Sequence, residues 1–283
     1  MIEPLLSDDA LLADVAVAAR SLELLHLWWL GQSGFLVQWN GHRMLMDPYL
    51  SDSLTEKYAR TDKPHVRMSR RVVDPARLDA IDVVTTSHNH TDHLDAATLK
   101  VVCRENPDLE LVAPLPNLAF INERLGSNTP TFCGLKDGER DTVWGFEVTG
   151  IASAHEELDI DEEGNNLYLG YVIRAGPHVI YHSGDTVLYE GLIEKLRPFN
   201  IDVALLPING RAPERRVAGN LWGREAAWLG LVIGAKLVIP CHYDMFEFNT
   251  TTPDEFIAEC ERLKQPYRVL QLGERFSSSE LPK

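Results

Sequence analysis

Residues 88–93 hold the densest set of reactive side chains in the chain, with the sequence His-Asn-His-Thr-Asp-His. Three imidazoles and one carboxylate within six positions suit Zn, Mn, Fe or Ni, because these ions bind imidazole nitrogen and carboxylate oxygen. The segment directly follows the apolar run 81–86, so we expect a tight turn at a strand end that aims alternate side chains at two neighbouring ions. The alternative is a histidine-rich polar surface turn, which would be costly without a ligand.

Three further candidate ligands follow apolar runs in the same way. His155 comes after the run 146–152, Asp185 after 178–181 and His242 after 237–240. Taken singly, His155 or His242 would be read as a structural histidine. If these strands lie side by side, however, their ends converge on one rim, where a fold collects residues distant in sequence.

The elements that must position these residues alternate between strand and helix. We expect a helix at residues 10–20, capped by residues 7–9, and an opening hairpin turn at Asn40-Gly41. Strands are predicted at 24–30, 35–39, 44–46, 83–87, 109–113, 167–174, 178–182, 201–206, 237–240 and 268–272, and further helices at 95–105, 117–125, 224–233 and 253–263. Hairpins mixed with crossovers predict two packed β-sheets covered by helices outside.

The length of 283 residues is at the upper end of what one hydrophobic core supports, so one large domain or two fused half-domains are both expected. We divide the chain into an N-terminal helical appendage at 1–23 and a single large domain at 24–283. The 45% hydrophobic content is typical of a packed globular protein.

Charge and composition limit the classes of binding partner and the cellular compartment that we expect for this chain. Lys and Arg number 27 against 42 Asp and Glu, a net charge of -15, which disfavours nucleic acid and anionic membrane surfaces and favours a small substrate. The four cysteines show no paired spacing, the N-terminus lacks the basic start of a secretory signal, and no apolar run reaches the length of a membrane span. We therefore expect a cytoplasmic protein.

Several motifs together resemble the metallo-β-lactamase superfamily, and more narrowly its L-ascorbate-6-phosphate lactonase-like branch. The resemblance covers about residues 27–273 and rests on Trp28-Trp29-Leu30-Gly31, Asp47-Pro48, residues 87–93, Tyr181-His182-Ser183-Gly184-Asp185, Gly234-Ala235-Lys236 and Ile239-Pro240-Cys241-His242. It implies an α/β fold of α+β type, the four-layer αββα sandwich, with a metal site at the edge of two sheets.

The resemblance also assigns roles to the candidate ligands. By position, one metal would be held by His88, His90 and His155. The second would be held by Asp92, His93 and His242. Asp185 would bridge the two, and Asp47 would orient a ligand histidine from behind.

The chemistry implied is hydrolysis. Two divalent ions about 3.5–4 Å apart can hold a hydroxide at neutral pH and polarise the substrate oxygen. With one ion, Asp92 would position and deprotonate the water instead. An oxidative diiron centre usually places a carboxylate where His90 stands, and a nuclease needs a basic track, so both are disfavoured. Zn²⁺ or Mn²⁺ are the expected ions, one or two per chain.

Two regions are candidates for binding the substrate. Arg211, Arg215 and Arg216, with Asn209 nearby, follow a predicted strand and could receive a phosphate or carboxylate; the alternative is that they pair with surface acids. The aperiodic segment from Pro48 to Pro75 is equally a lid or a solvated excursion.

His182 and Tyr243 flank candidate ligands. Either could donate a proton to the leaving group or a hydrogen bond to an oxyanion, and either could be a packing residue.

We therefore expect a metal-dependent hydrolase acting on a lactone or ester of a small anionic, sugar-phosphate-like molecule. A phosphodiesterase is the alternative, and a metal-binding regulatory protein without turnover is the third. A homo-oligomer remains open.

Overall fold

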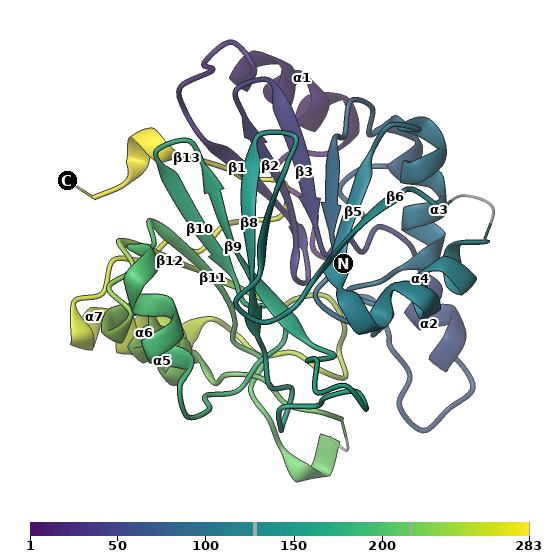
Figure 1. The fold of residues 1–283 in the computed structure, drawn as a ribbon. Helices are drawn as coiled ribbons and strands as arrows, with labels where there is room; N and C mark the ends of the chain where they lie inside the picture. The colour runs from purple at the N-terminus through teal and green to yellow at the C-terminus, as the bar shows by residue number, and fades with distance from the viewer. Residues whose placement is uncertain (127–128, 216, 283) are drawn as a thin grey trace.

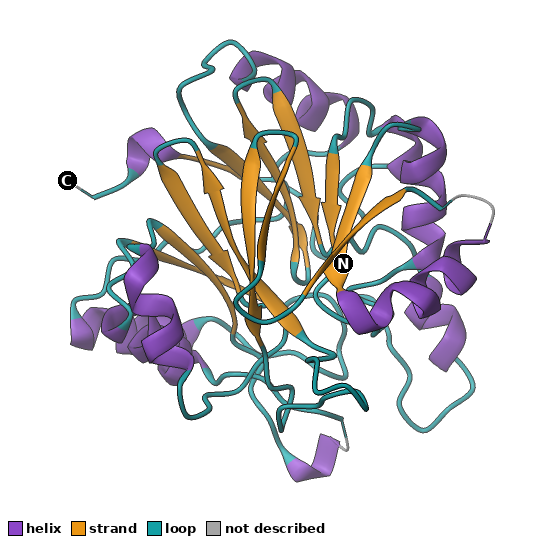
Figure 2. Cartoon of the chain, viewed as in Figure 1, coloured by secondary structure: helices purple, strands orange, loops and turns teal. Residues whose placement is uncertain are grey.

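The computed structural model describes residues 1–126, 129–215 and 217–282. Two β-sheets pack face to face and helices cover both outer faces, as Figures 1 and 2 show. The large hydrophobic core lies between the sheets and under the helices, with residues such as Trp28, Phe35 and Tyr171 buried in it. This arrangement confirms the predicted α/β architecture of two sheets flanked by helices.

The first sheet contains seven strands in the order β13-β1-β2-β3-β4-β5-β6. Its strands are β1 (His26–Gly31), β2 (Gly34–Trp39), β3 (His42–Met46), β4 (Val83–Thr85), β5 (Glu110–Pro114), β6 (Thr131–Leu135) and β13 (Arg275–Ser277). Strands β1 to β3 form an antiparallel meander, with Asn40-Gly41 at the second turn, and β3 to β6 run parallel. The parallel strands all end at the same edge, which is where β4 delivers the histidine-rich segment.

The second sheet contains six strands in the order β12-β11-β10-β9-β8-β7. Its strands are β7 (Arg140–Val143), β8 (Phe146–Ala152), β9 (Leu169–Ala175), β10 (His178–His182), β11 (Val203–Pro207) and β12 (Leu237–Cys241). Strands β10, β11 and β12 are parallel, and all five residues of β11 and of β12 are buried. Strands that are buried on both faces in this way have a nearly continuous run of apolar residues in the sequence.

The helices are α1 (Asp8–Ala18), α2 (Ser53–Tyr58), α3 (Ala96–Glu105), α4 (Leu118–Leu125), α5 (Leu192–Leu196), α6 (Gly223–Val232) and α7 (Asp254–Leu263). In Figure 1, α3 and α4 lie beside the first sheet and α5, α6 and α7 beside the second. Helix α1 buries Leu11, Val15 and Ala18 in the main core. The segment expected to be an appendage therefore shares its hydrophobic contacts with the sheets.

One predicted strand is wrong. The segment 268–272 is not a sheet strand in the structure; Tyr267 makes a single bridge to Val238, and the C-terminal strand is β13, paired with β1. Alternation of apolar and polar residues is present at 268–272, but Leu270 and Leu272 are buried without a ladder.

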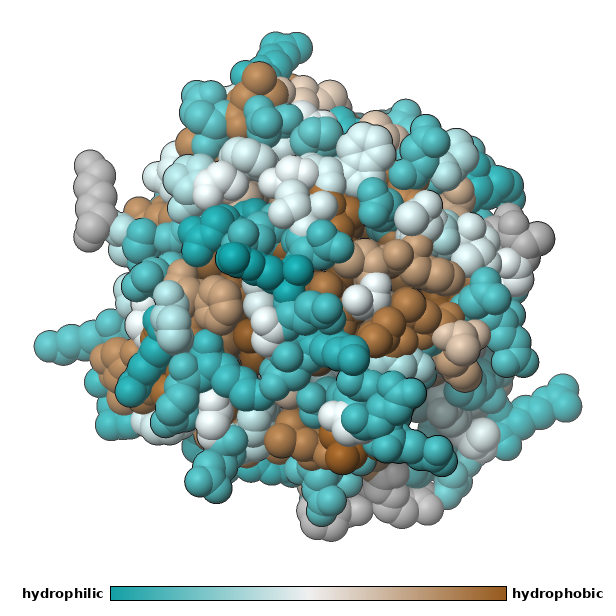
Figure 3. All heavy atoms as spheres, in the orientation of Figure 1, coloured by the Kyte–Doolittle hydropathy of each residue, from teal (hydrophilic) through white to brown (hydrophobic). Residues whose placement is uncertain are grey.

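In the described part of the chain, every helix is too short or too polar to span a bilayer. The face in Figure 3 mixes hydrophilic and hydrophobic residues, with the hydrophobic ones in separate patches.

Candidate metal centre

The turn after β4 is shaped by its own backbone hydrogen bonds. The amides of His93 and Leu94 both donate to the carbonyl of His90, at 3.1 and 2.8 Å. Directly afterwards the Asp95 carboxylate accepts from the amides of Ala97 and Thr98 and caps α3. The metal-ligand candidates are therefore held in a short rigid turn between a buried strand and a capped helix.

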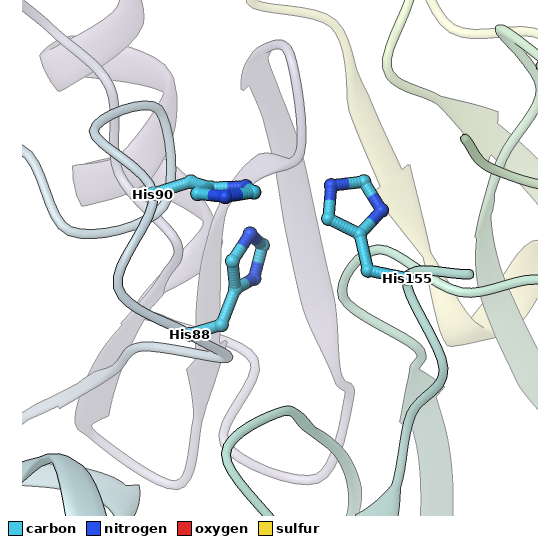
Figure 4. Close-up of side chains that lie close together, drawn as sticks. All are labelled: His88, His90 and His155. Carbon is cyan, nitrogen blue, oxygen red and sulfur yellow. The ribbon is translucent and has the colours of Figure 1, made fainter. Parts of the chain in front are cut away.

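The ends of β8, β10 and β12 meet this turn. His155 follows β8, Asp185 follows β10 and His242 follows β12, so all three lie at the rim to which β4 also leads. Figure 4 shows the rings of His88, His90 and His155 around one shared space. Ligand atoms lie within 4.8 Å of one another in three groups, namely His88, His90 and His155; His88, His93 and Asp185; and Asp92, His93 and His242.

Asp185 lies between the histidine groups. Its Oδ1 is 3.2 Å from Nε2 of His93, and its Oδ2 is 3.4 Å from Nε2 of His155 and 3.3 Å from Nε2 of His242. The preceding Gly184 has φ of +58°, and a Cβ there would lie 2.5 Å from the Cβ of Ser87. Only glycine allows this turn to approach the histidine segment closely enough to place Asp185 among the imidazoles.

Strong electrostatic coupling marks the cluster. Burial by itself would lower the pKa of His242, but the carboxylates of Asp185 and Asp92 raise it to about 9. Burial likewise opposes the charged form of His93, and Asp185 and Asp92 again raise its pKa well above the usual range. Burial and neighbouring imidazoles lower the pKa of His88 well below that range. The Asp92 side of the cluster therefore attracts positive charge, and the His88 side offers neutral imidazole.

Several buried polar atoms of the cluster have no hydrogen-bond partner among the described residues, which indicates whether a cation fits here. Nε2 of His88, Nε2 of His93 and Oδ1 of Asp185 are buried and have no hydrogen-bond partner among the described residues. Buried polar atoms are normally satisfied, and imidazole nitrogen with carboxylate oxygen is a donor set that divalent metals prefer. These residues could hold one or two divalent ions.

Asp47 supports the cluster from behind. Its Oδ2 lies 2.6 Å from Nδ1 of His93, and both side chains are fully buried. The Ser87 amide and hydroxyl also donate to this carboxylate. Because Asp47 accepts a hydrogen bond from Nδ1–H of His93, the lone pair of Nε2 in that tautomer is left to bind a cation.

Gln32 is a site residue that the sequence analysis missed. Its amide Nε2 donates to Oδ2 of Asp92 at 2.8 Å and lies 3.1 Å from Nε2 of His242. The backbone carbonyl of Gln32 accepts a hydrogen bond from the backbone amide of His242, at 2.9 Å. Gln32 stands at φ of +50° in the turn between β1 and β2. The only available signal was a polar residue between Gly31 and Ser33 at a strand end.

A cavity of about 480 Å³ opens over the cluster. His90, Asp92, His155, Asp185 and His242 line its floor. The segment from Pro48 to Pro75 contributes Leu54, Lys57, Tyr58, Lys63 and His65 to its wall. The His65 ring stacks on Tyr58, with centroids 4.4 Å apart. Residues of this segment therefore form part of the cavity wall.

His182 and Tyr243 do not line this cavity as the described residues define it, which corrects their expected proton-donor roles. His182 is fully buried, and its Nε2 lies 2.9 Å from the carbonyl of Ser33. Tyr243 stacks on Trp29 and donates to the carbonyl of Leu270. Both side chains are buried in the packed interior, although the nearby candidate ligands Asp185 and His242 line the cavity.

The predicted arginine cluster is also directed elsewhere. Arg211 forms two hydrogen bonds of 2.7 Å with the carboxylate of Glu225 and does not line the cavity within the described ranges. Arg215 donates to the carbonyl of Asn209, and the Asn209 amide donates to Asn249. Arg216 lies outside the described residues. Arg211 is therefore paired with an acid, as the alternative interpretation held, whereas Arg215 bonds the backbone of its own loop at Asn209.

Comparison with known proteins places the chain in a family. Residues 26–242 match a sequence profile described as a beta-lactamase superfamily domain. The chain belongs to the metallo-β-lactamase superfamily. Among its curated relatives is a metal-dependent hydrolase from Opitutus terrae, 30% identical over 88% of this chain and 98% of the relative. Another, from Caldivirga maquilingensis, is 27% identical over 86% of this chain and 93% of the relative, and is also named a metal-dependent hydrolase.

A solved structure agrees on the fold. A metallo hydrolase from Ignicoccus hospitalis superposes with a TM-score of 0.65, at 22% identity, over 90% of this chain and 98% of that chain. At this identity the likeness shows the metallo-β-lactamase fold alone.

Proposed function

We propose that this protein is a metal-dependent hydrolase that cleaves a lactone or another ester of a small anionic, sugar-phosphate-like molecule. The observation that carries the proposal is the convergence of imidazole and carboxylate ligand atoms at one cavity. Several of these atoms are buried and have no hydrogen-bond partner among the described residues. The relatives named metal-dependent hydrolases support the reaction class. The lactone substrate rests on the narrower resemblance to sugar-phosphate lactonases.

We assign the ligands in two groups. His88, His90 and His155 would hold one divalent cation. Asp92, His93 and His242 would hold a second. Asp185 is positioned to reach both, since its two oxygens lie within 3.4 Å of imidazole nitrogens from each group. Zn²⁺ and Mn²⁺ both suit these donors.

When bound, the cations would lower the pKa of a water molecule and polarise the substrate oxygen. The chain's own residues prepare the site for this chemistry. Asp47 fixes the tautomer of His93, and Gln32 orients the Asp92 carboxylate with its amide. If the second group holds no cation, the Asp92 carboxylate would position the water molecule and accept its proton. Tyr58 and Phe246 contribute aromatic side chains to the cavity wall.

The test joins metal analysis to a substrate screen. The purified protein is stripped with a chelator, reloaded separately with Zn²⁺ and Mn²⁺, and assayed against lactones, carboxylic esters and bis-nitrophenyl phosphate. We expect one or two cations per chain and turnover of a lactone or ester. Preferred cleavage of the phosphodiester would replace the lactone assignment, and binding of metal without turnover of any of the three would favour a regulatory role.

A matched pair of variants tests whether the bound metal depends on the assigned ligand residues. His155→Ala removes a predicted ligand, and we expect it to lower metal stoichiometry. His178→Ala removes a histidine at the start of β10 that contacts the carbonyl of Glu23 instead, so it should leave stoichiometry unchanged. Equal metal content in both variants would refute the ligand assignment.

A further inference from the structure

Arg124, near the end of α4, reaches into the cavity beside the metal-ligand turn. Its Nη1 donates to the carbonyl of Asn89 at 3.1 Å, and its Nη2 donates to Oγ1 of Thr91 at 2.8 Å. These two residues flank His90 in the turn. The guanidinium is therefore fixed immediately next to the candidate metal ligands, and it lines the same cavity.

No carboxylate lies within ion-pair distance of Arg124 among the residues that the structure describes. Burial lowers the pKa of Arg124, and the acid that opposes this effect is Asp95. The Asp95 carboxylate, however, already accepts hydrogen bonds from Ser53, Ala97 and Thr98. Arg124 thus keeps a partly desolvated positive charge that the described protein neutralises only weakly.

The guanidinium also retains donors. It has five N–H groups, and the hydrogen bonds to Asn89 and Thr91 use two of them. Phe120, one helical turn earlier, lies with its ring centroid 5.6 Å from the Arg124 guanidinium carbon. This cation–π contact and the two bonds to the turn hold the group in one orientation, which lowers the entropy cost of binding a ligand.

The cavity wall is positive although the chain is strongly negative. Lys57 and Arg124 line it, whereas among the described residues its carboxylates are Asp92 and Asp185, both in contact with imidazoles of the cluster. A cavity with this distribution in a chain of net charge -15 concentrates anions locally. Any divalent cation on the floor would strengthen the effect.

We propose that Arg124 anchors an oxyanion of the substrate, a carboxylate or a phosphate, and thereby makes the site selective for anionic substrates. This inference rests on the proposed hydrolase function and names the group that would recognise the anionic end. In this role Arg124, on helix α4 beside the first sheet, replaces Arg211 and Arg215. Arg211 pairs with Glu225 of α6, and Arg215 donates to the carbonyl of Asn209. A planar guanidinium with free N–H groups matches either oxyanion.

The experiment compares charged and neutral substrates of the same length. Nitrophenyl esters whose acyl chains end in methyl, carboxylate or phosphate are assayed with the metal-loaded wild-type protein, Arg124→Met and Arg124→Lys. For Arg124→Met we expect KM for the anionic esters to rise by about 10- to 100-fold, since it loses hydrogen bonds to a charged group, and KM for the methyl ester to change less than about twofold. Arg124→Lys should recover part of the loss.

Two controls separate anchoring from support of the turn. Arg104→Gln removes an exposed arginine that pairs with Glu105 on α3, and it should change none of the three KM values. Metal content is measured in every variant. If Arg124→Met loses metal and slows all three esters equally, Arg124 only supports the turn and the inference is overturned. An unchanged ratio of anionic to neutral KM overturns it as well.

Direct binding keeps the inference testable if the hydrolase proposal fails. Succinate and inorganic phosphate are titrated calorimetrically into the metal-loaded wild-type protein and Arg124→Met, with no turnover required. Coordination of the anion to the cation is common to both proteins, so a Kd at least about tenfold weaker in the variant supports the anchor. If the wild-type protein and Arg124→Met have equal Kd values for each anion, the anchor is rejected. If only one anion binds more weakly to the variant, that anion shows whether the site binds a carboxylate or a phosphate.

Discussion

Replacing Asp47 with Asn should weaken metal binding by about 10- to 100-fold, the range observed when a carboxylate behind a ligand histidine is lost. Oδ2 of Asp47 lies 2.6 Å from Nδ1 of His93, with both side chains fully buried. The carboxylate accepts three hydrogen bonds, from His93, the Ser87 amide and the Ser87 hydroxyl. An amide offers one acceptor oxygen, so either orientation of its NH₂ group faces a donor.

The magnitude follows from these contacts. A hydrogen bond to a charged group contributes about 1.5–3 kcal/mol, and each tenfold change in Kd corresponds to about 1.4 kcal/mol. Loss of this one bond therefore accounts for about one to two orders of magnitude in affinity. Backbone strain does not add to the effect, because Asp47 has φ of +40° and Asn tolerates the left-handed region well.

The assay is competition between the protein and a chromophoric chelator, with circular dichroism to confirm that the variant folds. The matched control is Asp82→Asn, since Asp82 also pairs with a histidine, His42, at 3.3 Å but lies outside the cavity as described. We expect this control to bind metal as the wild type does. Affinity of Asp47→Asn within about twofold of the wild-type value would refute the argument that His93 is a ligand held by Asp47.

Three further outcomes can be checked. Gln32→Ala should lower kcat/KM by about tenfold or more, because Asp92 loses a charge-assisted hydrogen bond of 2.8 Å. Steady-state kinetics on the substrate identified in the screen measures this loss. An unchanged kcat/KM means that the Gln32 amide has no role in orienting Asp92. Metal binding at pH 7 should release protons, and affinity should rise with pH towards 9. The reason is that the raised pKa of His242, about 9, leaves that imidazole protonated until a cation displaces the proton. Calorimetry in buffers of different ionisation enthalpy measures the release, and zero released protons would contradict this electrostatic description. Arg211→Ala should leave KM unchanged while lowering thermal stability slightly, since this half-exposed arginine pairs with Glu225; a raised KM would return it to the substrate site.

Long periodic segments were predicted well from the sequence, while weakly apolar ones were missed. Helix α3 and strands β2 and β10 match their predicted spans within a few residues. Strand β7 was missed because three of its four residues are exposed, and an edge strand of this kind has no apolar alternation to detect. Strand β13 was misplaced because its pairing with β1 joins residues about 250 positions apart, which local patterns do not encode.

The sequence alone predicted the residues of the candidate metal site, and the structure brings their ligand atoms close together. Histidines and aspartates stand directly after buried strands, and parallel strands end at a common rim, so local pattern and sheet geometry together bring them to one edge. That argument needs only residue types and the strand period. It therefore reached His88, His155, Asp185 and His242 without coordinates.

Only the tertiary structure decided which polar side chains serve that centre. Arg211 and Arg124 are equally polar in the sequence, yet Glu225 neutralises the first, while the second lies in the cavity without a carboxylate partner among the described residues. The same holds for His182, which was expected in the site but points into the core, and for Gln32, which was not expected there but donates to Asp92. The direction of a side chain and the charge of its neighbour depend on contacts between distant segments, and these exist only once the two sheets have packed.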